Sequence, residues 1–168
     1  MNTQVLIIMG SDSDLPIMEE ACKLLKAFSV PFEMTIASAH RSPDRLHRIV
    51  ENAEKKGVSV IIAGAGAAAH LAGVVASHTI LPVIGVPIDS SPLRGIDSLF
   101  STVQMPPGIP VATMAVGMAG AKNAAILAVE MLALTDPKLQ KRLRSFREKM
   151  TKEVEDKANA LKNRDCGH

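Results

Sequence analysis

The stretch Val5-Leu6-Ile7-Ile8-Met9-Gly10-Ser11-Asp12-Ser13-Asp14 decides the fold. It joins an apolar run, Val5–Met9, directly to a short polar loop. A second extended run, Phe32–Ala37, leads in the same way into the polar loop Ser38–Pro43. Each reads as a strand followed by the loop that opens a helix. In an open parallel sheet such loops meet at the carboxyl edge of the strands, where ligands bind.

Strands and helices alternate along the rest of the chain. The first helix is predicted to begin near Ser13 or Asp14, with Pro16 in its first turn, and the second to have Ser42 as its cap. The inner stripe of the first helix is Met18, Ala21, Cys22, Leu25 and Phe28. Further strands are predicted at 58–63, 82–86 and 111–116, a loop between the last two, and a small-residue helix at 121–133.

This order predicts an α/β fold, a flavodoxin-like three-layer sandwich with a central parallel sheet and an extra C-terminal helix. Residues 1–136 form the main domain, and Asp136 caps a last helix in 137–168. That helix carries one continuous apolar stripe: Leu139, Leu143, Phe146, Met150, Val154, Ala158 and Leu161. We expect the stripe to pack partly on a neighbouring subunit; packing on its own domain is the alternative.

Composition narrows the possible functions. The chain has 168 residues, of which 47% are hydrophobic, so it is not disordered. Two cysteines, Cys22 and Cys166, make no disulfide framework, and no signal peptide is evident, so we expect a cytoplasmic protein.

The apolar stretch 58–88 contains His70, His78 and Pro82, which argues against a membrane span. Basic residues near the C-terminus alternate with acids, which favours a solvated helix over nucleic-acid binding.

The two polar loops carry groups that suit a phosphorylated sugar. Ser11 and Ser13 lie at a helix N-terminus, a natural anion site, where Asp14 can bind ribose hydroxyls; a simple capping cluster is the alternative. In the second loop Arg41 offers a planar fork for phosphate, and His40 can shuttle a proton near neutral pH. The alternative for this pair is a surface salt-bridging role.

A third loop, Gly64–His70, consists of small residues that let the backbone approach a ligand closely. His70 and His78 lie on an apolar helix, where a histidine is more often a hydrogen-bonded core residue than a catalyst. No spacing typical of a zinc site is present, so no metal is expected. The G-x-S-x-G turn of serine hydrolases is also missing.

Five blocks of sequence, in order, closely resemble the N5-carboxyaminoimidazole ribonucleotide mutase family of purine (IMP) biosynthesis. They are Gly10–Asp14, Ser38–Pro43, Gly64–Leu71, Leu81–Pro87, and Asp97–Leu99 with Val103–Pro106. The resemblance implies a flavodoxin-like homo-octamer with active sites at subunit interfaces and no metal or organic cofactor. It implies an isomerase that moves a carboxylate from the exocyclic nitrogen of an aminoimidazole ribonucleotide to ring carbon 4.

Carried over by position, the resemblance makes His40 the residue that removes the proton from that carbon. It implies that the phosphate is held by Ser11, Ser38 and Arg41, beside Ser13, and the ribose by Asp14. It implies a pocket for base and carboxylate lined by Ala65, Gly66, Ala67, His70 and Leu71. Family members usually have Gly at Ala67 and Pro at Ala72, so the chain departs from the pattern at two small residues.

Two other functions remain open on sequence alone. The related aminoimidazole ribonucleotide carboxylases make the same product from free carbon dioxide, but typically have Lys after the histidine and lack the Gly64–His70 block; Arg41 favours the mutase. A non-catalytic flavin or nucleotide carrier can share the fold. Flavin sites usually enclose the ring between aromatic side chains, and this chain has no Trp and no Tyr.

Overall fold

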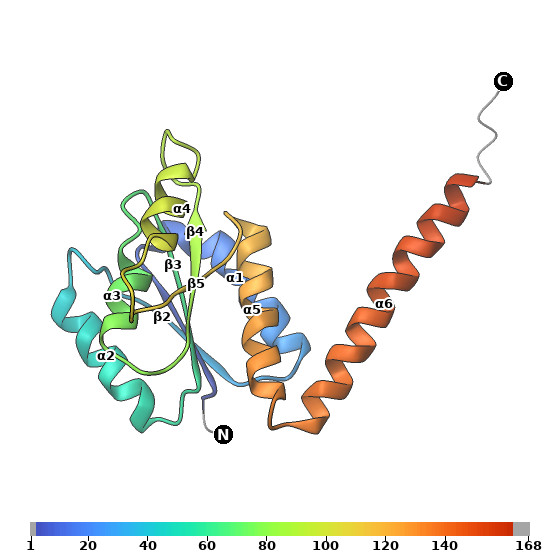
Figure 1. The fold of residues 1–168 in the computed structure, drawn as a ribbon, viewed down its shortest axis with the longest axis horizontal. Helices are drawn as coiled ribbons and strands as arrows, with labels where there is room; N and C mark the ends of the chain where they lie inside the picture. Colours follow the sequence, from blue (N-terminus) through green and yellow to red (C-terminus); the bar gives the residue numbers. More distant parts are fainter. Residues whose placement is uncertain (1–2, 163–168) are drawn as a thin grey trace.

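The computed structural model describes residues 3–162, which fold into a parallel sheet enclosed by helices (Figure 1). The strands are β1 (Val5–Met9), β2 (Phe32–Ile36), β3 (Val60–Gly66), β4 (Val83–Ile88) and β5 (Ala112–Thr113). The helices are α1 (Leu15–Ala27), α2 (Pro43–Lys55), α3 (Leu71–Ser77), α4 (Ile96–Val103), α5 (Met118–Ala133) and α6 (Pro137–Lys162). A short 3₁₀ turn, η1 (Asp12–Asp14), precedes α1.

The sheet has the predicted flavodoxin-like topology. Its strand order is β2-β1-β3-β4-β5, and every neighbouring pair is parallel. Val5 of β1 is in register with Phe32 of β2 on one side and with Val60 of β3 on the other. The chain therefore reverses its direction of travel across the sheet between β1 and β3, the switch point at which ligands bind in this class of fold.

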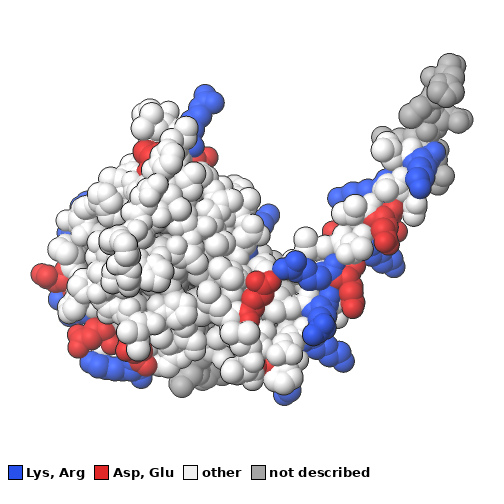
Figure 2. Space-filling model, in the orientation of Figure 1, with Lys and Arg blue, Asp and Glu red and all other residues white. Residues whose placement is uncertain are grey.

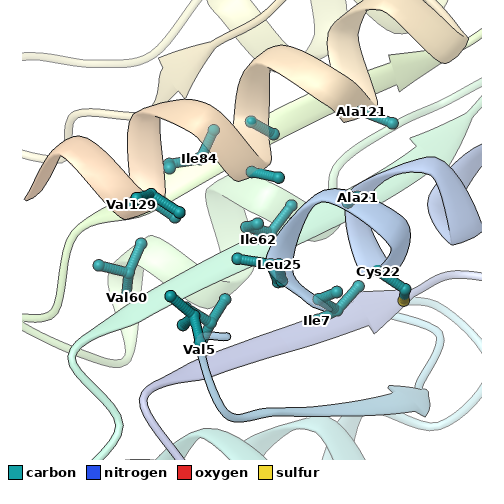
Figure 3. Packing of buried hydrophobic residues seen from close by; sticks show 14 of the residues in the cluster. Val5, Ile7, Ala21, Cys22, Leu25, Val60, Ile62, Ile84, Ala121 and Val129 are labelled. Atoms are coloured by element: carbon teal, nitrogen blue, oxygen red, sulfur yellow. The ribbon is translucent and has the colours of Figure 1, made fainter. Parts of the chain in front are cut away.

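Two apolar cores lie on opposite faces of the sheet, which makes the predicted three layers. Helices α1 and α5 cover one face, where small side chains such as Ala21 and Ala121 let them pack closely (Figure 3). Helices α2 and α3 cover the other face. Strand β4 is buried along its whole length because it is covered on both sides. The inner stripe predicted for α1, including Cys22, is buried.

Helix α4 was not predicted from the sequence. It occupies Ile96–Val103, within a segment that was predicted to be a loop. It packs beside β4 with its polar side inward: Ser98 and Thr102 are buried and bond to backbone carbonyls. Its apolar side chains point outward, with Ile96 59% and Phe100 57% exposed. The pattern is inverted relative to an ordinary surface helix, so a search for an inward apolar stripe does not find it.

Strand boundaries differ from the prediction at the glycine-rich loop. Strand β3 begins at Val60 and continues through Gly66, so the segment 64–66 is paired backbone rather than loop. Strand β4 likewise runs on to Ile88. The fifth strand was predicted over 111–116 but pairs only over Ala112–Thr113, at the edge of the sheet.

The helix caps also differ in detail. Asp14 is the cap residue of α1 by position, as predicted, but its side chain makes no cap bond to that helix. The side-chain caps belong to η1, where Ser11 Oγ accepts from the Ser13 N–H and the Asp14 carboxylate accepts from the Ser11 N–H. Ser42 is the cap residue of α2 by position, but its hydroxyl makes no cap bond. It bonds instead to the backbone of Ser38, accepting from the amide at 3.0 Å, and so closes the second loop.

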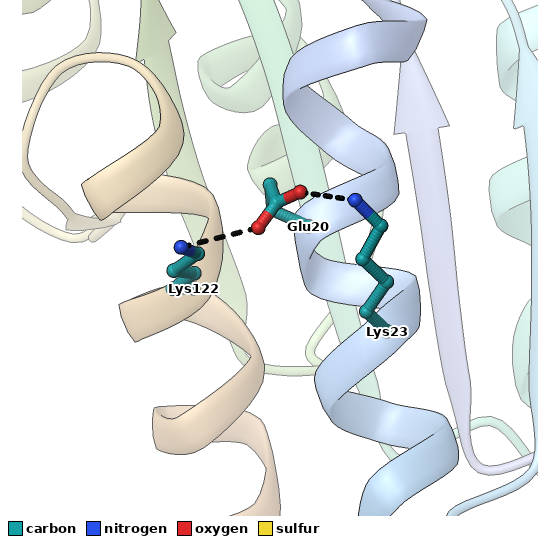
Figure 4. A network of polar contacts seen from close by, with 3 residues as sticks. All are labelled: Glu20, Lys23 and Lys122. Carbon is teal, nitrogen blue, oxygen red and sulfur yellow. Dashed lines mark hydrogen bonds and ion pairs between the residues drawn. The ribbon is translucent and has the colours of Figure 1, made fainter.

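An ion-pair cluster ties α1 to α5 on the surface. Glu20 lies between Lys23 of its own helix and Lys122 of α5, with 3.2 Å between the Glu20 carboxylate and Lys122 Nζ (Figure 4). The lysines hold the pKa of Glu20 below its usual value. Both lysines are more than half exposed, so the cluster adds little to stability.

Helix α6 divides into a docked half and a projecting half. Asp136 Oδ1 accepts from the Lys138 amide at 2.8 Å, which confirms the predicted cap. Leu139 is buried, and the Phe146 ring meets Phe28 edge-on at 5.3 Å. Beyond this point the helix leaves the body of the molecule (Figure 1), and Val154 is 67% exposed. Lysine and arginine alternate with acids along it (Figure 2).

Within residues 3–162, no helix combines the length and apolarity that a bilayer crossing needs. Cys166 lies outside the described residues.

Candidate functional site

A polar cavity of about 250 Å³ opens at the carboxyl edge of the sheet, beside the switch point. Loops that follow β1, β2, β3 and β4 line it. It brings together most of the residues singled out from the sequence: Ser11, Ser13, Asp14, Ser38, His40, Arg41, Ala65, Gly66 and Leu71. Their roles toward a substrate remain predictions.

The first loop presents two hydroxyls around a buried carboxyl group. Ser11 Oγ donates to Asp12 Oδ1 at 2.9 Å and accepts from the Ser13 amide at 3.4 Å. Asp14 is only 3% exposed. Burial raises the pKa of Asp14, against the opposing effect of hydrogen bonds from the Ser11 and Gly10 amides. Asp14 therefore stabilises the cap of η1 and also lines the cavity.

Arg41 connects the first two loops. Its Nη2 donates to the Gly10 carbonyl at 3.3 Å, and its amide donates to Ser38 Oγ at 3.1 Å. Because strands β1 and β2 are neighbours, the guanidinium lies beside the hydroxyls at the start of η1. Backbone amides, hydroxyls and one guanidinium at a helix N-terminus form an arrangement that suits a phosphate group.

His70 does not line the cavity, but its ring meets the ring of His40, which does. His40 Nε2 lies 2.9 Å from His70 Nδ1, within hydrogen-bond distance, and the ring planes cross at 75°. His70 is the residue just before α3. The sequence favoured a hydrogen-bonded core position for His70. In the structure His70 is exposed and contacts His40.

The third wall of the cavity is nearly free of side chains. Ala65, Gly66 and Ala68 line it, with Leu71 behind them. Ala67 does not line the cavity; it has a φ of +50°, a left-handed conformation that favours glycine. Glycine, which the family resemblance leads us to expect here, adopts this conformation without strain.

Ser90 is a lining residue that sequence reasoning missed. It follows β4, so its place at the same strand edge could have been found by extending the search to the loop after the fourth strand. Gly10, Ala39 and Ala68 also line the cavity; each is adjacent to a residue that was singled out.

A larger hollow of about 920 Å³ lies at the opposite edge of the sheet, around the segment 77–82 that precedes β4. It contains none of the predicted site residues. No group of three or more metal-ligating side chains that could hold an ion occurs in the part of the chain that the structure describes. The hydroxyls, guanidinium, imidazole and small residues that line the polar cavity suit anion binding, proton transfer and confinement of a small molecule.

The chain is similar in sequence to known proteins along most of its length. The family model described as "AIR carboxylase" matches residues 4–153. The N5-carboxyaminoimidazole ribonucleotide mutase of Pyrococcus abyssi is 60% identical over 147 residues, which cover 88% of this chain and 83% of that protein. The phosphoribosylaminoimidazole carboxylase of Saccharomyces cerevisiae is 54% identical over 155 residues, 92% of this chain but 27% of that longer protein.

A solved structure shares the fold almost throughout. The crystal structure of Treponema denticola PurE superposes with a TM-score of 0.87 at 27% identity, covering 96% of this chain and 99% of that one. Because the family model spans most of the sequence and the curated relatives align over nearly all of it, the chain belongs to the AIR carboxylase family.

Proposed function

We propose that this chain is an N5-carboxyaminoimidazole ribonucleotide mutase, an isomerase of purine biosynthesis. The observation that carries the proposal is the cavity at the switch point, which joins an anion-binding corner to an imidazole across a wall of small residues. Curated relatives of that name align over most of the chain at up to 60% identity.

The anion-binding corner holds the ribonucleotide phosphate. Ser11, Ser13 and Ser38 supply hydroxyls, and Arg41 supplies the fork. Asp14 accepts hydrogen bonds from the ribose hydroxyls. Ala65, Gly66 and Leu71 surround the base and the migrating carboxylate, and Ala67 and His70 lie next to these residues in the chain.

The positions of the hydrogens in substrate and product define the role of His40. In the substrate the exocyclic nitrogen carries one hydrogen and ring carbon 4 carries one; in the product the nitrogen carries two and the carbon none. One proton must therefore reach the nitrogen as carbon dioxide leaves, and one must leave the carbon after carbon dioxide is captured. His40 reaches the cavity and can serve both steps as acid and then base.

The wall of small residues keeps the released carbon dioxide inside the cavity. An apolar molecule held against Ala65, Gly66 and Ala68 has an effective concentration far above that in buffer, which favours recapture by carbon 4. Neither transfer of the carboxylate nor the two proton steps needs a metal or an organic cofactor.

We also propose a homo-octamer in which the projecting half of α6 packs on a neighbouring subunit. The support is the exposure of its apolar stripe together with the outward apolar side of α4. A cytoplasmic location fits the free buried thiol of Cys22, whose pKa is raised by burial.

The test separates a mutase from a carboxylase, the name carried by the yeast relative. Unlabelled carbamate substrate is supplied with labelled bicarbonate in solution, and the 4-carboxylate product is collected at early times. A mutase gives mostly unlabelled product, with slow entry of label as the confined gas leaks. His40→Asn, which keeps size and polarity but takes up no proton at neutral pH, serves as the inactive control.

Two outcomes contradict the proposal in favour of a carboxylase, and a third contradicts it in favour of a carrier. One is label entering the product as fast as the product forms. The other is that aminoimidazole ribonucleotide with physiological bicarbonate proves the better substrate; either result makes the chain a carboxylase. Binding of the ribonucleotide with no conversion at all would make it a carrier.

A further inference from the structure

The polar cavity is unevenly supplied with side chains that can bind a charged group. The strand order β2-β1-β3-β4 places the loops that line it in the same order along the edge of the sheet. The loops after β1 and β2 form the anion-binding corner. The other half is lined by residues at or after the ends of β3 and β4: Ala65, Gly66, Ala68, Leu71 and Ser90. Among these described residues, Ser90 alone has a side chain that can donate a hydrogen bond.

Ser90 lies where the base of a bound ribonucleotide is expected. Neighbouring strands are about 4.8 Å apart, so the end of β4 lies about 10 Å from the end of β1, two strands away. That separation is comparable with the distance from the phosphate to the base in a ribonucleotide. A substrate whose phosphate contacts Ser11 therefore has its base, and the carboxylate that the base carries, in front of β3 and β4.

The Ser90 hydroxyl is held against the wall of small residues. A β-carbon on Gly66 would overlap Ser90 Oγ, so glycine at this position leaves the space that the hydroxyl occupies. The next hydroxyl along the chain, Ser91 Oγ, instead accepts from the Leu93 amide at 3.1 Å, and Ser91 does not line the cavity. Ser90 is therefore the hydroxyl of this segment that a ligand in the cavity can reach.

The acid beside Ser90 points away from the cavity. Asp89 does not line it, and Asp89 Oδ1 would lie 3.4 Å from a β-carbon on Gly117, just before α5. The acid that does line the cavity, Asp14, precedes α1 and lies on the β1 side, two strands from β4. A negatively charged group can therefore lie next to Ser90 without a carboxylate directly beside it.

We propose that the Ser90 hydroxyl donates a hydrogen bond to the carboxylate while that group moves from the exocyclic nitrogen to carbon 4. This inference rests on the proposed function and adds a residue to it. The bond from nitrogen to the carboxyl carbon breaks, and its electron pair stays on the nitrogen, which takes a proton. Carbon 4 then supplies the electron pair of the new bond and releases its proton. Ser90 keeps its own proton throughout and holds one oxygen of the moving group in place.

A hydroxyl suits a group whose charge changes during the reaction. The carboxylate is negatively charged in substrate and product, but carbon dioxide is neutral. A Lys or Arg at this place would stabilise the charged forms much more than the neutral gas, and so would oppose its release. Among the described lining residues Arg41 is the single Lys or Arg, and it follows β2, three strands from β4.

The first test measures binding, without turnover, by isothermal titration calorimetry in buffer free of bicarbonate. The two ligands are 4-carboxyaminoimidazole ribonucleotide, which carries the carboxylate, and aminoimidazole ribonucleotide, which lacks it. Ser90→Ala should bind the carboxylated ligand about 10- to 100-fold more weakly than wild type, the usual effect of losing a hydrogen bond to a charged group. It should bind the other ligand with wild-type affinity. Ser90→Thr keeps the hydroxyl and should bind both ligands as wild type does.

The second test follows carbon dioxide during turnover. With unlabelled carbamate and labelled bicarbonate, early product from Ser90→Ala should contain a larger share of label than wild-type product, because the gas is held less firmly. We expect kcat to fall about tenfold. Ser91→Ala is the matched control, since it removes a hydroxyl from the same segment outside the cavity. It should match wild type in both tests.

Three outcomes overturn the inference. Equal losses of affinity for both ligands in Ser90→Ala would mean that Ser90 only shapes the pocket. Wild-type affinity for both ligands would mean that it does not contact the carboxylate. Affinities for Ser90→Thr equal to those of Ser90→Ala would mean that the hydroxyl is not the group involved. A wild-type chain that does not convert the carbamate defeats the proposed function instead, and the comparison of the two ligands still shows whether Ser90 binds the carboxylate.

Discussion

The α-carbon of Gly66 packs against the side chain of Ser90, so closely that a β-carbon on Gly66 would overlap the Ser90 hydroxyl. The same β-carbon would lie 3.2 Å from the Ile88 carbonyl, which is fixed backbone. Gly66 ends β3 and Ser90 follows β4, so this contact joins two neighbouring strand ends at the cavity wall.

Gly66→Ala should therefore push the Ser90 side chain out of place. We expect a loss of about 1–3 kcal/mol in the free energy of unfolding, as in other overpacked sites, and a raised KM. Denaturant unfolding and steady-state kinetics measure the two effects.

A double-mutant cycle with Ser90→Gly tests the cause. Removing the Ser90 side chain takes away the atoms that a new β-carbon meets first. The double variant should be more stable than the sum of the two single changes predicts, by roughly 1 kcal/mol. Simple additivity would show that the two residues do not interact in this way.

Ala67→Gly should stabilise the protein. The φ of +50° destabilises the folded protein by about 1–2 kcal/mol when the residue has a β-carbon, and glycine removes this strain. Glycine also makes the unfolded chain more flexible, which lowers the free energy of unfolding by about 0.4–1 kcal/mol. The net gain is about 0.5–1 kcal/mol, seen as a melting temperature higher by roughly 1–4 °C.

Ser29→Gly is the matched comparison, because Ser29 has a φ of +56° and lies after α1, whereas Ala67 lies between two residues that line the polar cavity, Gly66 and Ala68. It should gain stability by a similar amount and leave KM unchanged. A lower melting temperature for Ala67→Gly, with a gain at Ser29, would mean that the Ala67 methyl group makes contacts that outweigh its backbone strain.

The sequence predicted the site well where the signal was local. Ser11 and Arg41 lie in the loops that follow β1 and β2, whose extended runs were predicted, so the rule that parallel strand ends meet at one edge was enough to place them together. The pairing of His40 with His70 was beyond reach, because it depends on two loops crossing the end of β1. Helix α4 was missed because Ser98 and Thr102 face inward, where a periodic apolar stripe was sought.

Arg41→Lys should weaken substrate binding. Lysine keeps the charge but loses the planar fork and the bond from Nη2 to the Gly10 carbonyl. We expect KM to rise about tenfold, equivalent to about 1.4 kcal/mol, with kcat changed much less. Arg45→Lys is the control, because Arg45 bonds to the Ile36 carbonyl outside the polar cavity. Equal KM values for wild type and Arg41→Lys would place the phosphate elsewhere.

Asp14 gives a pH dependence of known sign. Burial raises its pKa above the ordinary value of 3.8, so folding favours the protonated carboxyl group. The stability that this group contributes is present at low pH and is lost as pH rises through the folded pKa. Asn at this position does not titrate. The free energy of unfolding of wild type, relative to Asp14→Asn, should fall from pH 3.5 upward and level off above the folded pKa, as followed by urea unfolding at about half-unit steps. A difference that grows with pH would mean a lowered pKa.

The projecting half of α6 provides the last prediction. Met150 is 49% exposed, Val154 67% and Leu161 63%, and they continue the stripe whose first part is docked on the body. If a neighbouring subunit covers them, Val154→Glu puts a charge into an apolar interface and should dissociate the assembly. Lys152→Gln changes the net charge by the same amount on an exposed polar position of the same helix and should leave the assembly intact. Burial of each large apolar side chain is worth about 1.5–3 kcal/mol, so loss of the contact should also lower the melting temperature. Light scattering reports the subunit count of each protein. An unchanged count for Val154→Glu would mean that the projecting stripe is not part of the interface.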